Sequence, residues 1–194
     1  MRTLVWTYHR SARAIVYIAV ALLFSCNDAE YQLDNEFDPA NLGIEPPAAF
    51  FHPGVIDTFS VGDTGSFQLY SYNITGVAGA HLNVLYGKLY GEGNSITIDS
   101  VTLDPFFVNE NNECIMFWED DRQEGILDVF LFYRPTLNTR TTSGTGSMAS
   151  VHFRVVSDGI SELLYGESTR FVDAVNSPVT INEYGVGTID VTNP

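Results

Sequence analysis

The 194-residue sequence has few basic residues, few cysteines and none of the motifs that mark the common enzyme classes. Nine Lys and Arg stand against 24 Asp and Glu, which gives a formal net charge of −15. This acidity argues against nucleic acid as a partner, because phosphate binding needs a basic surface. The two cysteines are too few for a disulfide framework and lack the spacing of a zinc site.

Catalytic patterns are also lacking. There is no nucleophile elbow, histidine-base motif, phosphate-binding loop or dinucleotide fingerprint. Adjacent acids such as Asp120 and Asp121 would point to opposite faces of a strand, whereas hydrolysis by paired carboxylates needs two acids across a cleft. The acid-rich stretch from Trp118 to Gly125 matches no calcium loop and is typical of a solvated hairpin tip. We expect no enzyme activity, no metal site and no cofactor.

The apolar run near the start is too short to span a membrane. It extends over about eleven residues, Ala14 to Phe24, whereas a spanning helix needs about 20. Arg2, Arg10 and Arg13 precede it, and no acid does. A basic start, a short apolar run and a small residue at its end are typical of a secretory signal, which we assign to residues 1–25.

The four residues Leu23-Phe24-Ser25-Cys26 resemble the bacterial lipobox, in which the signal peptidase cuts before the cysteine and the cysteine is acylated. The resemblance implies that Cys26 is lipidated. Several acyl chains give stable anchoring, at about 0.8 kcal/mol per buried methylene. We expect a lipid-anchored protein of the bacterial cell envelope, at the outer membrane or the cell surface. Removal of residues 1–25 leaves 169 residues, with six basic residues against 24 acidic ones and a net charge of −18.

The next segment, residues 26–47, is rich in acids and prolines and holds no basic residue. Such a segment cannot bury enough apolar surface to fold alone, so we expect a flexible acidic tether between the lipid and a domain. Its part "LDNEFDPANLGIEPP" also resembles a linker that follows the lipid-bearing cysteine in many bacterial surface lipoproteins.

Residues 48–194 have the composition of β structure, because short runs of aromatic and β-branched residues are separated by Gly, Asn, Asp and Pro. No segment of helical length has an apolar stripe with the 3.6-residue period. We expect an all-β fold, a two-sheet β-sandwich of about nine or ten strands. The candidate strands are Ala48–Phe51, Gly65–Tyr72, Ala80–Tyr86, Ser95–Leu103, Cys114–Glu119, Leu127–Tyr133, Met148–Val156, Glu162–Tyr165, Arg170–Asp173 and Gly187–Val191.

Two of these strands alternate between two faces, as strands with one buried face do. Opposite the apolar face, "AHLNVLY" places His81, Asn83 and Leu85, and "MASVHFRVV" places Ser150, His152 and Arg154. By contrast, "ILDVFLFY" is apolar at nearly every position, which indicates a strand covered on both faces or one whose outer face meets a partner.

Cys114 is left unpaired if Cys26 carries the lipid. It lies in the apolar run "ECIMFW", with no His or basic residue near it in the sequence. This setting predicts a buried small apolar residue rather than a reactive thiol.

Two stretches, Ser60–Gly87 and Gly144–Thr180, resemble the cohesin modules of cellulosome scaffoldins. The shared features are Val61-Gly62-Asp63 at the start of a strand, the turn from Asn73 to Ala80, the run from Gly146 to Ala149, Phe153-Arg154-Val155, Gly159, and Val172-Asp173-Ala174. Their order and spacing match over residues 48–191. The resemblance implies a jelly-roll β-sandwich that binds a dockerin, a protein module. Tyr86-Gly87-Lys88 departs from the Tyr-Asp-Pro of many cohesins, and residues 87–143 match poorly.

In cohesins the dockerin lies on the sheet face formed by the third, fifth, sixth and eighth strands. The resemblance therefore implies a partner-binding face that includes the outward residues named above: His81, Asn83, Leu85, Ser150, His152 and Arg154. Leu85 would supply apolar area and the polar groups would set the register. His81 and His152 would be cross-strand neighbours, but two histidines make an incomplete metal site.

Two other interpretations stay open. The fold is shared with carbohydrate-binding modules, in which exposed aromatic rings stack on sugars. Tyr86, Tyr90 and Trp118 are the candidates for stacking, and the partner would be a polysaccharide held near the cell. Alternatively, the apolar strand "ILDVFLFY" would make the protein a structural subunit of an envelope assembly.

Overall fold

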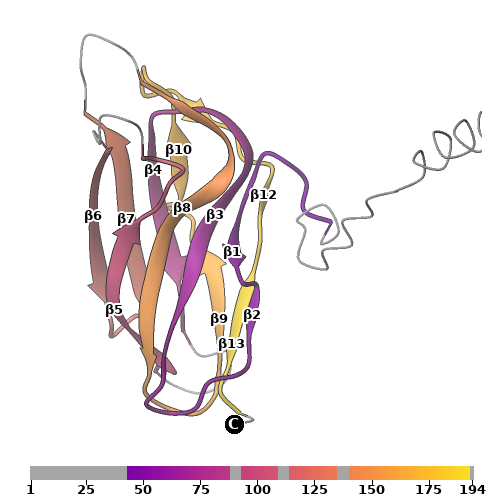
Figure 1. Ribbon diagram of the computed structural model, residues 1–194, viewed down its shortest axis with the longest axis vertical. Coiled ribbons are helices and arrows are strands. Elements are labelled where there is room, and N and C mark those ends of the chain that lie inside the picture. Colours follow the sequence, from indigo (N-terminus) through magenta and orange to yellow (C-terminus); the bar gives the residue numbers. More distant parts are fainter. Residues whose placement is uncertain (1–42, 88–92, 109–113, 135–139, 193–194) are drawn as a thin grey trace, which may run out of the picture. The chain divides into compact units, whose positions relative to one another are not determined.

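The computed structural model describes residues 43–87, 93–108, 114–134 and 140–192. Every regular element in these residues is a β-strand (Figure 1). The strands are β1 (Ala48–His52), β2 (Val55–Ile56), β3 (Thr64–Val77), β4 (Gly79–Leu85), β5 (Ile96–Leu103), β6 (Cys114–Asp121), β7 (Ile126–Tyr133), β8 (Thr142–Val155), β9 (Ile160–Tyr165), β10 (Arg170–Val172), β11 (Pro178–Val179), β12 (Glu183–Tyr184) and β13 (Gly187–Asp190). Within the same ranges, no helix is long and apolar enough to cross a membrane.

The first sheet has five strands in the order β12-β1-β3-β8-β5. Strands β3 and β8 are each 14 residues long and pair antiparallel, with Phe67 opposite Val151. Strand β5 pairs with the other edge of β8, and β1 pairs antiparallel with β3 and parallel with β12. Aromatic and β-branched side chains favour these strands because they pack well on a pleated surface.

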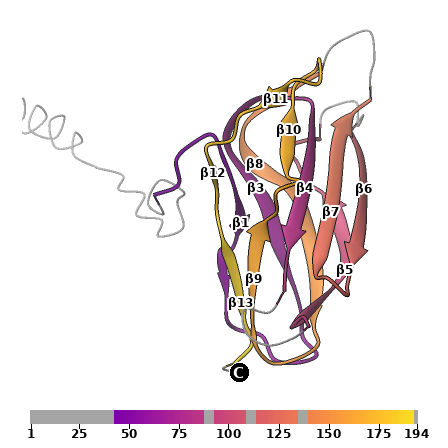
Figure 2. The ribbon, with the colours of Figure 1, turned by 180° about the vertical axis from the view of Figure 1, so that it is seen from behind.

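The second sheet has eight strands and is centred on β4. Strand β7 pairs with β4 along its whole length, from Gly79 opposite Phe132 to Leu85 opposite Ile126. Strands β10 and β9 share the other edge of β4, and β6 pairs with the far edge of β7. In Figure 2, β10, β4, β7 and β6 lie next to one another. Beyond β9 the sheet continues through β13 to β2.

The two sheets pack face to face around a core built from alternate residues. On β4, Leu82 and Val84 are fully buried, whereas the intervening Asn83 is only half-buried. This alternation is the period of two that the sequence predicts. The buried residues of this core range from Ala49 to Val191, so all of them lie within residues 27–194.

The predicted all-β, two-sheet sandwich is confirmed. All ten candidate strands are present, although β3 continues to Val77 and β8 begins at Thr142, beyond their predicted ends. The strands β2, β11 and β12 were not predicted. Each has only two residues, which is too short to show a period.

The chain enters the sandwich beside β12. The Asn182 side chain donates to the Pro46 carbonyl at 2.8 Å, and the Asn182 backbone N–H donates to the Pro47 carbonyl at 2.7 Å. The Glu45 backbone N–H donates to the Glu183 carboxylate at 2.7 Å. These bonds hold residues 45–47, the last part of the expected tether, against the domain.

Candidate functional site

One face of the sandwich carries aromatic and aliphatic side chains on its outer surface. We call it the aromatic face: the outward side chains of β10, β4, β7 and β6. Its members lie in rows across the four strands: Val172, Phe132 and Ile115; Arg170, His81, Phe130 and Phe117; Asn83, Asp128 and Glu119; Leu85 and Ile126. The cross-strand register sets these rows, because residues opposite each other share a face.

Three rings are stacked across the centre of the aromatic face. The imidazole of His81 lies on the ring of Phe130, with centroids 4.3 Å apart and an interplanar angle of 12°. The ring of Phe117 lies on the other side of Phe130, at 4.4 Å and 15°. Phe117 ends the stack and is 45% exposed, so an aromatic surface stays open to solvent. The stack spans β4, β7 and β6 and fixes the rotamers of all three side chains.

Next to the stack, the Asp128 carboxylate makes polar contacts with two side chains of β4. The His81 Nε2 atom lies 2.7 Å from the Asp128 Oδ1 atom, and the Asn83 side-chain amide donates to the same oxygen at 2.7 Å. One carboxylate therefore holds two neighbouring β4 side chains in place, which orients the imidazole on Phe130.

A pocket of about 130 Å³ lies between β10, β4 and β7, at the end of the aromatic face. Gly79 makes room for it, since a Cβ added there would lie 3.3 Å from both Phe132 Cβ and Val172 Cγ2. The pocket is lined by Gly79, Ala80, His81, Phe130, Leu131, Phe132, Arg170, Val172 and Asn176. Its walls are mostly apolar, and its polar side chains are His81, Arg170 and Asn176.

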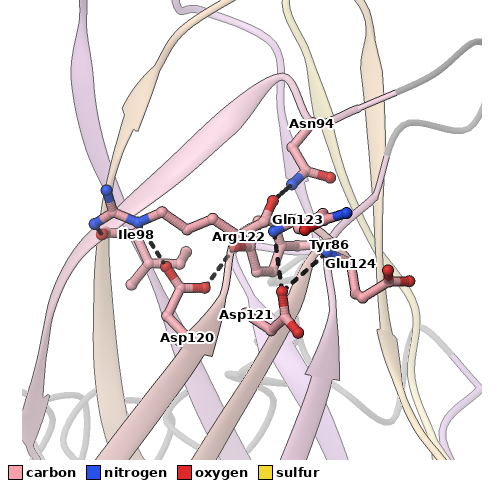
Figure 3. Close-up of polar contacts among 8 residues, drawn as sticks. All are labelled: Tyr86, Asn94, Ile98, Asp120, Asp121, Arg122, Gln123 and Glu124. Atoms are coloured by element: carbon pink, nitrogen blue, oxygen red, sulfur yellow. Dashed lines mark hydrogen bonds and ion pairs between the residues drawn. The ribbon is translucent and has the colours of Figure 1, made fainter.

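The β6–β7 hairpin tip is held by its own polar side chains (Figure 3). The side chain of Asp120 is only 5% exposed; it accepts from the Tyr86 hydroxyl at 2.5 Å and from Arg122 Nε at 3.1 Å. The Arg122 guanidinium also donates to the Ile98 carbonyl on β5, at 3.1 Å. This bond joins the edge of the aromatic face to the other sheet.

A second acid of the tip, Asp121, closes the turn. Asp121 accepts from the backbone N–H groups of Gln123 and Glu124, at 3.0 and 3.2 Å. Two of the four carboxylates of "WEDDRQEG", those of Asp120 and Asp121, are thus used by the hairpin itself, as in a solvated tip. Among the described residues, no group of three or more His, Cys, Asp or Glu could hold a metal ion.

The structure separates the six predicted partner-binding residues into two groups. His81, Asn83 and Leu85 lie on β4 and belong to the aromatic face. The expectation that Ser150, His152 and Arg154 share this face is wrong. They lie on β8 in the five-stranded sheet, so their outward side is the opposite surface of the sandwich. For the same reason, His81 and His152 are not cross-strand neighbours.

On β8 these three residues have other partners. His152 lies opposite Ser66 and Ser100, and its Nε2 atom is 3.4 Å from the Thr102 hydroxyl. Arg154 pairs with Asp99 at 3.1 Å. Ser150 donates to Asp104 at 2.6 Å. The alternation in the sequence of β8 shows that one face of the strand is buried, but it does not show which sheet the strand joins.

One of the three predicted sugar-stacking residues is not available for stacking. Tyr86 is fully buried, and burial together with the nearby Asp120 raises the pKa of its hydroxyl well above the ordinary value. The expectation for Tyr86 is therefore wrong, because a buried ring cannot stack on a polysaccharide. Trp118 is partly buried and packs against the core, and its role in stacking stays a prediction. Tyr90 lies outside the described residues, as does Cys26.

Cys114 is partly buried and packs against the core, as the sequence predicts. Burial raises the pKa of its thiol to about 11, so the nucleophilic thiolate is scarce at neutral pH.

Sequence reasoning did not select Phe117, Phe130 or Arg170. The signal for Phe130 was present, since "ILDVFLFY" is apolar at nearly every position. Of the two interpretations, coverage on both faces is wrong: Leu127, Val129 and Leu131 are buried, whereas Phe130 is only half-buried. The remaining interpretation, an outer face that meets a partner, stays a prediction.

No family model matches the chain, and no curated protein matches it by sequence. Solved structures do match. A non-cellulosomal cohesin from the archaeon Archaeoglobus fulgidus is 15% identical, with 73% of this chain and 86% of that chain covered and a TM-score of 0.55. The sixth cohesin of Acetivibrio cellulolyticus scaffoldin B, solved with a Cel5 dockerin, is 17% identical, with 74% and 97% covered and a TM-score of 0.56.

A type I cohesin–dockerin complex from Clostridium thermocellum also matches, at 13% identity, 74% and 96% coverage and a TM-score of 0.57. At these identities the similarity shows the fold. The domain is a cohesin-like β-sandwich, which confirms the resemblance in its sequence.

Proposed function

We propose that this protein is a non-catalytic, lipid-anchored protein of the cell envelope whose cohesin-like domain binds a dockerin-like protein module through the aromatic face. The stack of His81, Phe130 and Phe117, open to solvent at Phe117, carries the proposal. Soluble domains rarely expose contiguous apolar patches unless these bind something. An apolar centre with polar groups around it is the usual arrangement of a protein–protein interface.

The topology supports the choice of face. Counting only strands of four or more residues, β4, β6, β7 and β9 are the third, fifth, sixth and eighth strands. These are the strands that carry the dockerin in the family that the sequence resembles. Here they are contiguous in one sheet, since β7 lies between β4 and β6 and β9 pairs with β4. Two of the solved cohesins described above are in complex with dockerins.

The lipid anchor at Cys26 completes the proposal. It is supported by the resemblance of Leu23-Phe24-Ser25-Cys26 to a lipobox and by the acidic segment that follows. An anchored domain with an open docking face would hold secreted modules at the cell envelope.

A capture experiment with residues 27–194 tests the docking. The immobilised domain is exposed to the secreted proteins of its own organism, and captured proteins are identified by mass spectrometry. We expect capture of proteins that share one small module, at least about tenfold weaker with Phe117→Ser, because aromatic anchors dominate interface energies. Phe117→Tyr keeps the ring and should keep capture. Arg154→Glu, on the opposite face, should change nothing. Capture that is equal for Phe117→Ser and wild type would overturn the assignment of the face.

A further inference from the structure

The pocket at the end of the aromatic face is lined by a charged side chain, Arg170, that has no ion-pair partner among the described residues. Arg170, on β10, lies opposite His81 and is exposed. Among the described residues its guanidinium makes no hydrogen bond or ion pair, whereas Arg122 pairs with Asp120 and Arg154 with Asp99. The Arg170 guanidinium is therefore available to an acidic group of a partner.

The pocket beside Arg170 suits an aliphatic group. Gly79 leaves the space between Val172 and Phe132, and Phe130 is part of the lining. Its volume of about 130 Å³ is below the roughly 300–1,000 Å³ of pockets that hold drug-sized ligands, so it suits a group as small as one side chain. Burial of such a group is favourable because the walls are apolar.

The opposite edge of the aromatic face has the opposite charge. Glu119, on β6, lies across from Asp128 and is exposed. It makes no hydrogen bond or ion pair with the described part of the chain. Arg170 and Glu119 lie on strands three places apart in the sheet, about 14 Å at the usual strand spacing. Charges of opposite sign on the two edges orient a partner that carries the complementary pair.

We propose that the docked module inserts an aliphatic side chain into the Gly79 pocket, with a carboxylate beside it that pairs with Arg170, and places a basic side chain near Glu119. That the occupant is a protein module rests on the proposed function. The pocket supplies apolar area, and the two charges favour one direction of docking across the strands.

Three small molecules of the same shape test the pocket without any partner. The probes are 4-methylpentanoate, 4-methylpentan-1-ol and 4-methylpentylamine, titrated into residues 27–194 labelled for NMR. We expect all bound probes to shift the amide resonances of Gly79 and Val172. The carboxylate should bind about two- to fivefold more tightly than the alcohol, as expected for one partly exposed ion pair, and the amine most weakly.

Matched variants locate the site. Arg170→Gln should reduce the affinity for the carboxylate to that for the alcohol and leave the alcohol unchanged. Val172→Phe should fill the pocket and abolish binding of all three probes. Val175→Phe, three residues along and at a position that is 77% exposed, should change none of the affinities. Arg170→Gln alters only an exposed side chain, so it keeps the test decisive if Val172→Phe does not fold.

Two outcomes with the three aliphatic probes would overturn the inference. One is the absence of shifts at Gly79 and Val172 with every probe. The other is equal affinity for carboxylate and amine, which would leave Arg170 without a role. Cellobiose is titrated in parallel, and shifts at the pocket with cellobiose alone would also overturn it. The probe titrations do not depend on protein capture. They can therefore overturn the proposed pocket while capture still supports the docking face, and capture can overturn the docking face while the titrations still support the pocket.

Discussion

The imidazole of His81 and the ring of Phe130 lie parallel to each other on neighbouring strands, with their centroids 4.3 Å apart. Asp128, two residues before Phe130 on the same strand, binds the Nε2 atom of that imidazole at 2.7 Å. The polar and the apolar contacts of His81 thus come from one strand, β7. Phe117 continues the stack from β6, so its geometry is set by the register of three strands.

Removal of the middle ring should weaken both stability and binding. Phe130→Leu keeps apolar volume but loses two ring contacts, so we expect the free energy of unfolding to fall by about 1–2 kcal/mol. Urea denaturation measures it. Phe132→Leu is the control, since Phe132 has a single ring contact with Phe117, at 6.2 Å, and should lose less. An equal loss in both variants would contradict a structural role for the stack.

Asp120 and Asp121, both at the hairpin tip, should behave differently. Asp120→Ala leaves the Tyr86 hydroxyl buried without its partner, and the expected cost is about 1–3 kcal/mol of unfolding free energy. Asp121→Ala removes only bonds to exposed backbone groups of the turn, for which we expect about 0.5–1 kcal/mol. Thermal unfolding of both variants at neutral pH measures the difference. A larger loss for Asp121→Ala would contradict the assigned roles.

The domain should lose stability in alkali. Burial raises the pKa of Tyr86, Tyr165 and Tyr133 in the folded state. In the unfolded chain these hydroxyls titrate near pH 10, so above about pH 10 the unfolded state binds fewer protons and unfolding becomes easier. The stabilising contribution is complete below that pH and is lost as the pH rises.

We expect the urea midpoint to fall steadily from about pH 9 to about pH 11, and to fall less in Tyr86→Phe. A midpoint independent of pH over this range would refute the burial of these hydroxyls.

The thiol of Cys114 should react slowly while the domain is folded. Its pKa rises from 9.0 to about 11, so the thiolate fraction at about pH 8 falls by about a hundredfold. Residues 27–194 contain no other cysteine. Alkylation by iodoacetamide should be about a hundredfold faster after unfolding in urea. Equal rates in the two states would show that the thiol is freely accessible.

The strands could be predicted from the sequence because burial of one face leaves a period of two in the chain itself. Leu82 and Val84 alternate with Asn83 whatever their neighbours are, and the structure confirms this alternation. Two-residue strands such as Val55–Ile56 leave no such trace. They form because a partner strand, here β13, supplies their hydrogen bonds.

The assignment of strands to sheets could not be read from the same pattern. His152 and His81 both lie on the polar side of an alternating strand, yet their strands belong to different sheets. Pairing depends on residues distant in sequence, and alternation carries no information about the partner. The stack of Phe117 on Phe130 is an intermediate case. Both residues belong to one hairpin, so a known turn register would have predicted their contact.

The two outer surfaces of the sandwich differ in chemistry: rows centred on β8, such as Ser66, His152 and Ser100, are polar, whereas the aromatic face carries a stack of three rings among its polar residues. If the module docks only on the aromatic face, each chain would bind one copy of it. A secreted protein with two such modules would need two neighbouring chains. Their spacing in the membrane would then set an effective concentration, and avidity could exceed the single affinity by about a hundredfold or more without a new contact. Surface density would thereby become a quantity that the cell can regulate.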